Sequence, residues 1–359
     1  MGPEIPLVRS MTRIPPRTPA ITGILVDQNT FGNGQHDVDR RFRAYAAPMA
    51  RAERLDLDVG GLGPEGVEWI AADLIVPDGI SAAPLMACFP GGGMTRRYFD
   101  LPEEQPGEWS MAHYLADHFG IAVAVVDHPG VGDSSVPEDP YTLNPTVVAA
   151  VDHGALSELV AHAMDLFEPT RLIGLGHSMG GLVVAHAQWH HRSFDAVALL
   201  GFGGAGLPEY LSKAELSYAG NFERLEPVLA ELVRERFGTA LVPGSTTSSD
   251  MLNPGTLSAA RQVLASASGP LLALCGLASM VPGSSNAALA SIEVPVFIGL
   301  GENDIAGDIG KVAALLTSSV DVTTYVLAEA GHNHSISKNR TELWDALGNW
   351  VATLDEQSG

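Results

Sequence analysis

The sequence predicts an α/β protein with a mostly parallel central sheet, helices on both sides of the sheet and a helical insertion. Three observations support this fold class. Short continuous apolar runs recur along the chain, as expected for strands that are buried on both faces. Segments of helix length separate most of these runs, which is typical of parallel strands joined by right-handed crossovers. One interval of about 90 residues contains helical stretches but no convincing strand, and it is too long for a plain loop.

The chain is expected to begin with an extension and an antiparallel strand pair. Residues 1–52 are rich first in Pro and then in Arg, show no sustained period and are expected to carry no chemistry. The alternating segments RLDLDV and WIAADLIVP follow, separated by the turn GGLGPEG. The later buried strands are predicted at PLMACF, IAVAVVD, RLIGLG, DAVALLG, VPVFIGLG and VTTYVLAE. Helices are predicted at 109–119, 145–167, 179–191 and 307–317.

The insertion is expected to fold as a cap. Helical stretches lie around residues 208–219, 222–237, 255–267 and 271–281. We expect them to cover the carboxyl edge of the sheet, where α/β proteins bind ligands. The predicted organisation is an N-terminal extension (1–52), a core made of 53–204 and 291–359, and a helical cap (205–290).

Composition restricts the partners. The 359 residues include 42 Asp and Glu against 20 Lys and Arg, a formal net charge of −22, which argues against nucleic acid because phosphate binding needs clustered basic residues. Only Cys88 and Cys275 occur, too few for a disulfide framework, so a reducing compartment is favoured. The N-terminal region lacks an apolar signal core, and no apolar stretch is long enough to span a bilayer. We therefore expect a cytoplasmic protein that acts on a small molecule.

A serine lies on a predicted turn between a strand and a helix, in RLIGLGHSMGGLVVAHAQWHH. The residues Gly176-His177-Ser178-Met179-Gly180 match the pattern G-x-S-x-G. A serine on so tight a turn needs glycine two residues before and two residues after it, because side chains there would collide with the adjoining strand and helix. This context predicts that Ser178 is a nucleophile.

A serine nucleophile needs a base, and the base needs an acceptor that fixes its tautomer. Candidate acids follow the strand VPVFIGLG, in Gly301-Glu302-Asn303-Asp304. Candidate bases follow the strand VTTYVLAE, in Ala330-Gly331-His332-Asn333-His334. Both segments come at carboxyl ends of predicted strands, which is the edge where Ser178 is expected. The order Ser, Asp, His is the one expected for this type of turn.

These motifs resemble those of the α/β-hydrolase fold enzymes over about residues 53–355. GHSMGG (176–181) is similar to their nucleophile elbow, DHPGVGDS (127–134) to their D-x-P-G-x-G-x-S loop, and GENDIAGD contains their G-x-x-D. The insertion resembles the cap that such enzymes often carry between the sixth and seventh strands. The resemblance implies that Ser178 is the nucleophile, Asp304 the orienting acid and His332 the base.

Two neighbouring residues are alternatives within this triad. Glu302 competes with Asp304, but the family spacing from Gly301 favours Asp304. His334 competes with His332, and the Gly-His junction favours His332, which leaves His334 as a loop histidine without a role in proton transfer. No third spaced ligand accompanies the two histidines, so we expect no metal and no cofactor.

The oxyanion loop departs from the common family form. Many members have His-Gly after the third strand, whereas this chain has Phe89-Pro90-Gly91-Gly92-Gly93-Met94. Glycines still let backbone N–H groups approach a developing oxyanion. The two donors are predicted at Gly92 and Met179, with Gly93 as an alternative to Gly92.

A second glycine motif is not expected to bind a dinucleotide. Residues 201–206, GFGGAG, fit G-x-G-x-x-G, but helical sequence follows instead of the second strand of a βαβ unit. We interpret this segment as the flexible start of the cap.

The predicted function is that of a serine hydrolase that cleaves a carboxylic ester of a small, hydrophobic substrate through an acyl-enzyme. Similar motifs occur in enzymes that cleave thioesters, lactones, amides or carbon–carbon bonds, and these reactions remain alternatives. A cofactor-free perhydrolase and a non-catalytic ligand-binding protein on the same fold are further alternatives.

Overall fold

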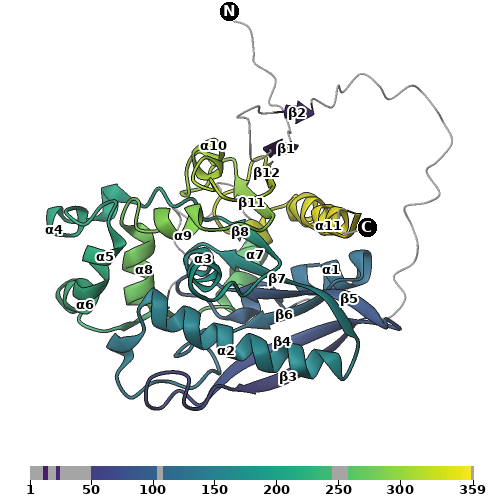
Figure 1. Ribbon diagram of the computed structural model, residues 1–359, viewed down its shortest axis with the longest axis horizontal. Coiled ribbons are helices and arrows are strands. Elements are labelled where there is room, and N and C mark those ends of the chain that lie inside the picture. The colour runs from purple at the N-terminus through teal and green to yellow at the C-terminus, as the bar shows by residue number, and fades with distance from the viewer. Residues whose placement is uncertain (1–10, 15–21, 25–49, 103–107, 245–257, 357–359) are drawn as a thin grey trace, which may run out of the picture.

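The computed structural model describes residues 11–14, 22–24, 50–102, 108–244 and 258–356 (Figure 1). The strands of the main sheet are β1 (Met11–Ile14), β2 (Thr22–Ile24), β3 (Ala50–Asp58), β4 (Trp69–Pro77), β5 (Ala82–Phe89), β6 (Ala122–Val126), β7 (Glu168–His177), β8 (Ala196–Leu200), β11 (Val296–Gly301) and β12 (Val322–Leu327). The helices outside the insertion are α1 (Met111–Phe119), α2 (Pro145–Met164), α3 (Met179–His191), α10 (Ile309–Ala313) and α11 (Arg340–Glu356).

The described strands form one sheet in the order β2-β1-β12-β11-β8-β7-β5-β6-β4-β3. The six strands from β12 to β6 in this order are parallel. Antiparallel strands flank them, β4 and β3 at one edge and β1 and β2 at the other. The predicted mostly parallel sheet and its antiparallel opening are confirmed.

Helices cover both faces of the sheet, so the central strands are buried on both sides. Along β5, Leu85 and Ala87 belong to the apolar cluster that contains α2 and α3, whereas Met86 and Cys88 belong to the cluster that contains α1 and α11. In Figure 1, α2 and α3 cross in front of the strands. This two-sided burial is why the sequence shows continuous apolar runs rather than alternation.

Helix ends are fixed by local capping. Helix α1 begins after Ser110, whose side chain accepts a hydrogen bond from the backbone N–H of His113, and it ends at Gly120 with φ 66°. Helix α2 begins with Pro145 after Asn144, whose side chain accepts from the N–H of Val147.

Among the described helices, none combines the length and apolarity needed to cross a bilayer.

The insertion between β8 and β11 contains more than helices. Its described α-helices and strands are α4 (Lys213–Leu216), α5 (Phe222–Leu225), α6 (Leu229–Phe237), β9 (Leu241–Pro243), α7 (Ser258–Ala265), β10 (Pro270–Leu272), α8 (Ala273–Met280) and α9 (Asn286–Ala290). No convincing strand is predicted in this interval, but β9 and β10 form an antiparallel pair. Strands of three residues are too short to show a recognisable period.

Two other expectations from the sequence need correction. The N-terminal extension contains β1, which pairs with β12, and β2, which pairs with β1, although its sequence shows no sustained strand period. The helix predicted at 307–317 is limited to Ile309–Ala313. Short elements that gain their stability from neighbouring chain segments leave little periodic signal in the sequence.

The topology places the ends of β5 and β7 side by side. The chain leaves β5 for β6 on one side and then crosses to β7 on the other side. Loops that follow β5 and β7 therefore diverge at the carboxyl edge, which is the usual position of a ligand site in an open α/β sheet.

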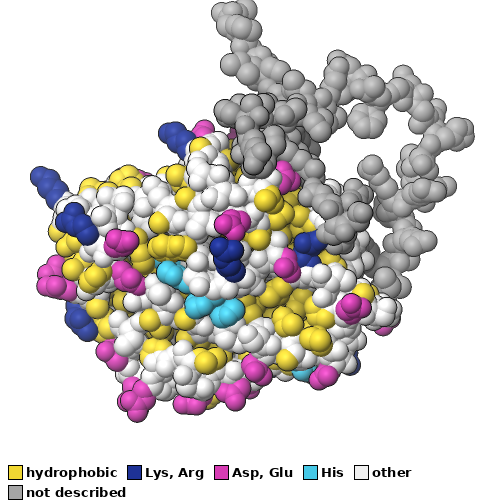
Figure 2. Space-filling model, viewed as in Figure 1, with side chains coloured by type: hydrophobic (Ala, Val, Ile, Leu, Met, Phe, Trp, Pro, Cys, Tyr) yellow, Lys and Arg dark blue, Asp and Glu magenta, His cyan; other side chains and the backbone are white. Residues whose placement is uncertain are grey.

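Figure 2 shows Asp and Glu side chains spread over one face of the molecule.

The loop DHPGVGDS is tied to the core by a buried arginine. Arg96 is 4% exposed, and its Nε–H donates to Asp73 at 2.6 Å while one of its terminal nitrogens donates to Asp133 at 2.9 Å. The other terminal nitrogen donates to Asp127, which is fully buried. Burial raises the pKa of Asp127, and the Arg96 charge works against this rise. A β-carbon at Gly132 would lie 2.1 Å from the Asp127 carboxylate, so this loop requires glycine there.

We predict that Arg96→Met lowers the free energy of unfolding by about 3–5 kcal/mol, because it leaves buried carboxylate charge without its partner. The matched control is Arg51→Met. The Arg51 side chain is 70% exposed and pairs with Glu53, so this variant should stay within about 0.5 kcal/mol of the wild type. Urea unfolding of both variants measures the difference, and equal effects would contradict a structural role for Arg96.

Candidate active site

Ser178 occupies a strained turn between β7 and α3. Its φ of 54° and ψ of −121° are those of the first central residue of a type II′ turn, a position normally filled by glycine. The Ser178 N–H donates to the carbonyl of Leu200 at 2.8 Å, and the N–H of Gly181 donates to the Ser178 carbonyl at 2.8 Å. These bonds to the neighbouring strand and helix hold the serine in a conformation that it would otherwise avoid.

The glycines around Ser178 allow three chain segments to meet. A β-carbon at Gly176 would lie 2.4 Å from the carbonyl oxygen of Gly180. A β-carbon at Gly180 would lie 2.3 Å from the carbonyl oxygen of Phe89, at the end of β5. Both distances are shorter than any non-bonded contact, so the approach of β5, β7 and α3 depends on glycine at both positions.

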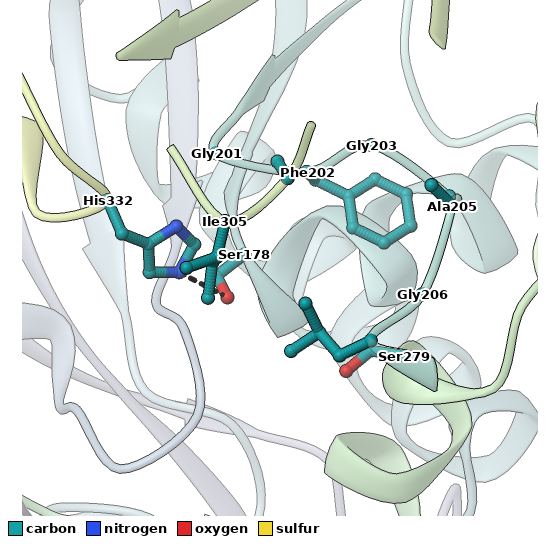
Figure 3. A pocket seen from close by; sticks show the side chains of 12 residues that line it. Ser178, Gly201, Phe202, Gly203, Ala205, Gly206, Ser279, Ile305 and His332 are labelled. Atoms are coloured by element: carbon teal, nitrogen blue, oxygen red, sulfur yellow. Dashed lines mark hydrogen bonds between the residues drawn. The ribbon is translucent and has the colours of Figure 1, made fainter. Parts of the chain in front are cut away.

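Ser178, His332 and Asp304 form a hydrogen-bonded series. The Ser178 hydroxyl lies 2.9 Å from Nε2 of His332, and Nδ1 of His332 lies 2.8 Å from Oδ1 of Asp304 (Figure 3 shows the first contact). Because a carboxylate only accepts hydrogen bonds, Nδ1 carries the proton and Nε2 is the acceptor for the hydroxyl. The His332 side chain is 3% exposed and that of Asp304 is fully buried.

The loops that carry the acid and the histidine are packed against each other. A β-carbon at Gly301 would lie 2.4 Å from the carbonyl oxygen of Gly331, and the N–H of Asn303 donates to the carbonyl of Ala330 at 2.8 Å. Glu302, the alternative acid, accepts instead from the N–H of Glu329 at 2.8 Å. Asp304 is therefore the carboxylate that contacts His332.

Burial and neighbouring side chains shift the pKa values of Asp304 and His177. Burial alone would raise the pKa of Asp304, but the charges and hydrogen bonds of His332 and His334 hold it well below its usual range. Burial lowers the pKa of His177, and the neighbouring His332 and His334 lower it further. The ring of His177 is thus uncharged at neutral pH, and its Nε2 lies 2.9 Å from the backbone carbonyl of His332.

The loop after β5 turns beside Ser178. The N–H of Met94 donates to the Gly91 carbonyl at 3.2 Å, and Gly93 has φ 79°, as the third residue of a type II turn requires. A β-carbon at Gly91 would lie 3.1 Å from Cβ of Ser178, and one at Gly92 would lie 2.5 Å from the side chain of Leu271 in β10. The assignment of Gly92 and Met179 as oxyanion donors, with Gly93 as the alternative, stays a prediction.

A buried histidine supports this loop and was missed in the sequence. Nδ1 of His128 lies 2.6 Å from Asp152 in α2, and Nε2 lies 3.2 Å from the carbonyl oxygen of Pro90. Burial works to lower the pKa of His128, but the Asp152 carboxylate raises it above its usual value. Because the Pro90 carbonyl can only accept, Nε2 carries a proton and fixes the start of the loop that follows β5. Only the folded chain reveals this contact, since no sequence motif links His128 to Asp152.

A small cavity adjoins Ser178 and His332. Its volume is about 40 Å³, and its walls include residues 201–207, Ser279 from α8 and Ile305 (Figure 3). The glycine-rich segment 201–206 passes from beside Ser178 to the insertion, as Figure 3 shows. This segment is part of the cavity wall, and the strand that precedes it, β8, is followed by the insertion rather than by a βαβ unit.

Comparison with known proteins identifies the family. The sequence profile of the alpha/beta hydrolase family matches residues 86–346, well over half of the chain. The chain belongs to the alpha/beta hydrolase family. A search among curated proteins found no match to this hydrolase.

Solved structures with the same fold include several kinds of hydrolase. A thermophilic esterase from Thermogutta terrifontis is 18% identical, with 84% of this chain and 98% of the esterase covered and a TM-score of 0.52. A monoacylglycerol lipase from Paleococcus ferrophilus is 16% identical, with 76% and 96% covered and a TM-score of 0.53. The epoxide hydrolase CorEH is 15% identical, with 85% and 99% covered and a TM-score of 0.51. At these identities the likeness concerns the hydrolase fold alone.

We predict that Gly180→Ala lowers the free energy of unfolding by about 1–3 kcal/mol, because the added methyl group meets backbone atoms that cannot rotate away. Gly310→Ala is the matched control. Gly310 lies in α10, where an added β-carbon would meet only the Asp308 side chain at 3.2 Å, so alanine should be neutral or slightly stabilising. Thermal unfolding compares the two, and a Gly180→Ala variant as stable as the control would contradict the steric argument.

Proposed function

We propose that this hydrolase cleaves a carboxylic ester of a small, hydrophobic substrate through an acyl-enzyme formed on Ser178. The observation that carries the proposal is the hydrogen-bonded series from the Ser178 hydroxyl through His332 to Asp304. A hydroxyl on a strained strand-to-helix turn, bonded to the free nitrogen of an oriented imidazole, is the arrangement that activates serine for attack on a carbonyl.

In the proposed first half-reaction, the Ser178 oxygen attacks the ester carbonyl carbon and its proton passes to Nε2 of His332. The N–H groups of Gly92 and Met179 stabilise the resulting oxyanion. Met179 is the first residue of α3, so its N–H has no partner within the helix and is available for this purpose. The carbon–oxygen bond to the alcohol then breaks, and His332 returns the proton to the departing alcohol.

In the second half-reaction, water attacks the acyl-enzyme. His332 takes a proton from that water, the bond to Ser178 breaks, and the proton returns to the serine oxygen. Asp304 remains ionised throughout and stabilises the imidazolium form of His332 in both halves. Its lowered pKa supports this role.

The substrate site is proposed to lie under the 205–290 insertion, acting as a cap. Ser279 of the insertion lines the cavity next to Ser178, and the N–H of Gly269 donates to the Gly93 carbonyl at 3.0 Å. A cavity of about 40 Å³ has room for only a few water-sized atoms, which supports a small substrate group. The two buried, unpaired cysteines support a reducing location such as the cytoplasm.

We predict that Ser178→Ala lowers the rate of ester hydrolysis at least about a thousandfold, while the fold is retained. Ser217→Ala is the matched control, because the exposed Ser217 hydroxyl only donates to the Ala214 carbonyl. A panel of 4-nitrophenyl esters measures the rates, and circular dichroism checks the fold. Activity of Ser178→Ala within tenfold of the wild type would sink the assignment of the nucleophile.

A further inference from the structure

A tight backbone turn brings two histidines to one carboxylate. The N–H of His334 lies 3.2 Å from the carbonyl oxygen of His332, and the residue between them, Asn333, has φ −89° and ψ 77°. These values are close to those of an inverse γ-turn, which folds the chain back over three residues. The two imidazole rings consequently flank Asp304, with Nδ1 of His332 at 2.8 Å from Oδ1 and Nε2 of His334 at 2.8 Å from Oδ2.

The Asp304 carboxylate has a donor for each of its lone pairs. Oδ1 accepts from His332 and from the N–H of Ala306 at 3.0 Å. Oδ2 accepts from His334 and from the N–H of Gly301 at 3.3 Å. A carboxylate offers about four acceptor sites, so loss of any one donor leaves a buried lone pair without a partner.

The hydrogen bond to Asp304 fixes the tautomer of His334. Nε2 must carry the proton, since the carboxylate cannot donate. Nδ1 is buried, and among the described residues it has no hydrogen-bond partner. A proton on Nδ1 would therefore be buried without an acceptor. The backbone nitrogen of Gly301 also lies 3.2 Å from Nε2 of His334. Because a protonated nitrogen cannot accept a hydrogen bond, the Gly301 N–H donates to Asp304 instead.

The titratable groups that face the two rings from other elements are uncharged. His177, at the end of β7, has its ring centroid 5.6 Å from that of His334 and 4.9 Å from that of His332. Burial, with these two histidines, keeps the pKa of His177 low. Tyr98, in the 3-10 helix Arg96–Tyr98, stacks on His177, and burial raises the pKa of its hydroxyl. Asp304 is thus the charged group that both imidazoles contact.

We propose that His334 is a positioning residue that acts on His332 through Asp304. This inference rests on the proposed function. The His334 N–H prevents the carboxylate from rotating, so that Oδ1 stays aligned with Nδ1 of His332. Loss of this N–H should therefore slow turnover.

The test compares His334→Asn with His334→Gln, two variants of equal polarity. The glutamine amide nitrogen can reach the position of Nε2, whereas the asparagine amide is one methylene shorter and cannot. We expect the Asn variant to lower kcat by about tenfold or more with KM nearly unchanged. The Gln variant should restore kcat toward the wild type.

Equal kcat values for the two variants and the wild type would overturn the proposal. A merely structural role would lower the free energy of unfolding without a loss of kcat that the Gln variant restores. Proton NMR reports on the contact between Asp304 and His332 without requiring turnover. The low-field resonance of His332 Nδ1–H should shift in the Asn variant and return in the Gln variant. If the wild type shows no Ser178-dependent turnover, the proposed function fails, and an unchanged resonance in both variants separately overturns the role of His334.

Discussion

The close approach of β5, β7 and α3 at Ser178 is the constraint on which the rest of the site depends. Glycine at 176 and 180 removes the side chains that would keep these segments apart, and the Leu200 carbonyl holds the serine N–H. The serine is forced to φ 54° as a result, and its hydroxyl projects at the carboxyl edge of the sheet. The loops that follow β11 and β12 open onto the same edge, so Asp304 and His332 join the hydroxyl in one hydrogen-bonded series.

Two further sets of contacts support the loop that follows β5, beside Ser178. The buried His128–Asp152 pair holds the Pro90 carbonyl. The insertion is joined to the same loop by backbone hydrogen bonds, including that from Thr95 N–H to the Ala267 carbonyl at 2.8 Å. A shift of the insertion would therefore also move the loop that is proposed to stabilise the oxyanion.

The sequence predicted the fold class well because buried parallel strands and glycine-dependent turns leave local signals. The strand, the turn at Ser178 and the spacing of Asp304 from Gly301 could all be recognised in short windows. The sequence failed where a contact joins distant residues: nothing local links His128 to Asp152, and His334 was interpreted as a loop histidine although it contacts Asp304 at 2.8 Å. The pair β9 and β10 was missed because three-residue strands have no measurable period.

The most direct measurement of the central claim is the intact mass of the protein after treatment with a reactive fluorophosphonate, with Ser178→Ala alongside. This reagent reports an activated serine without requiring knowledge of the substrate. The account predicts one adduct on the wild type, mapped to Ser178, and none on the variant. A folded wild-type protein that forms no adduct, or an adduct that persists in the variant, would contradict the account.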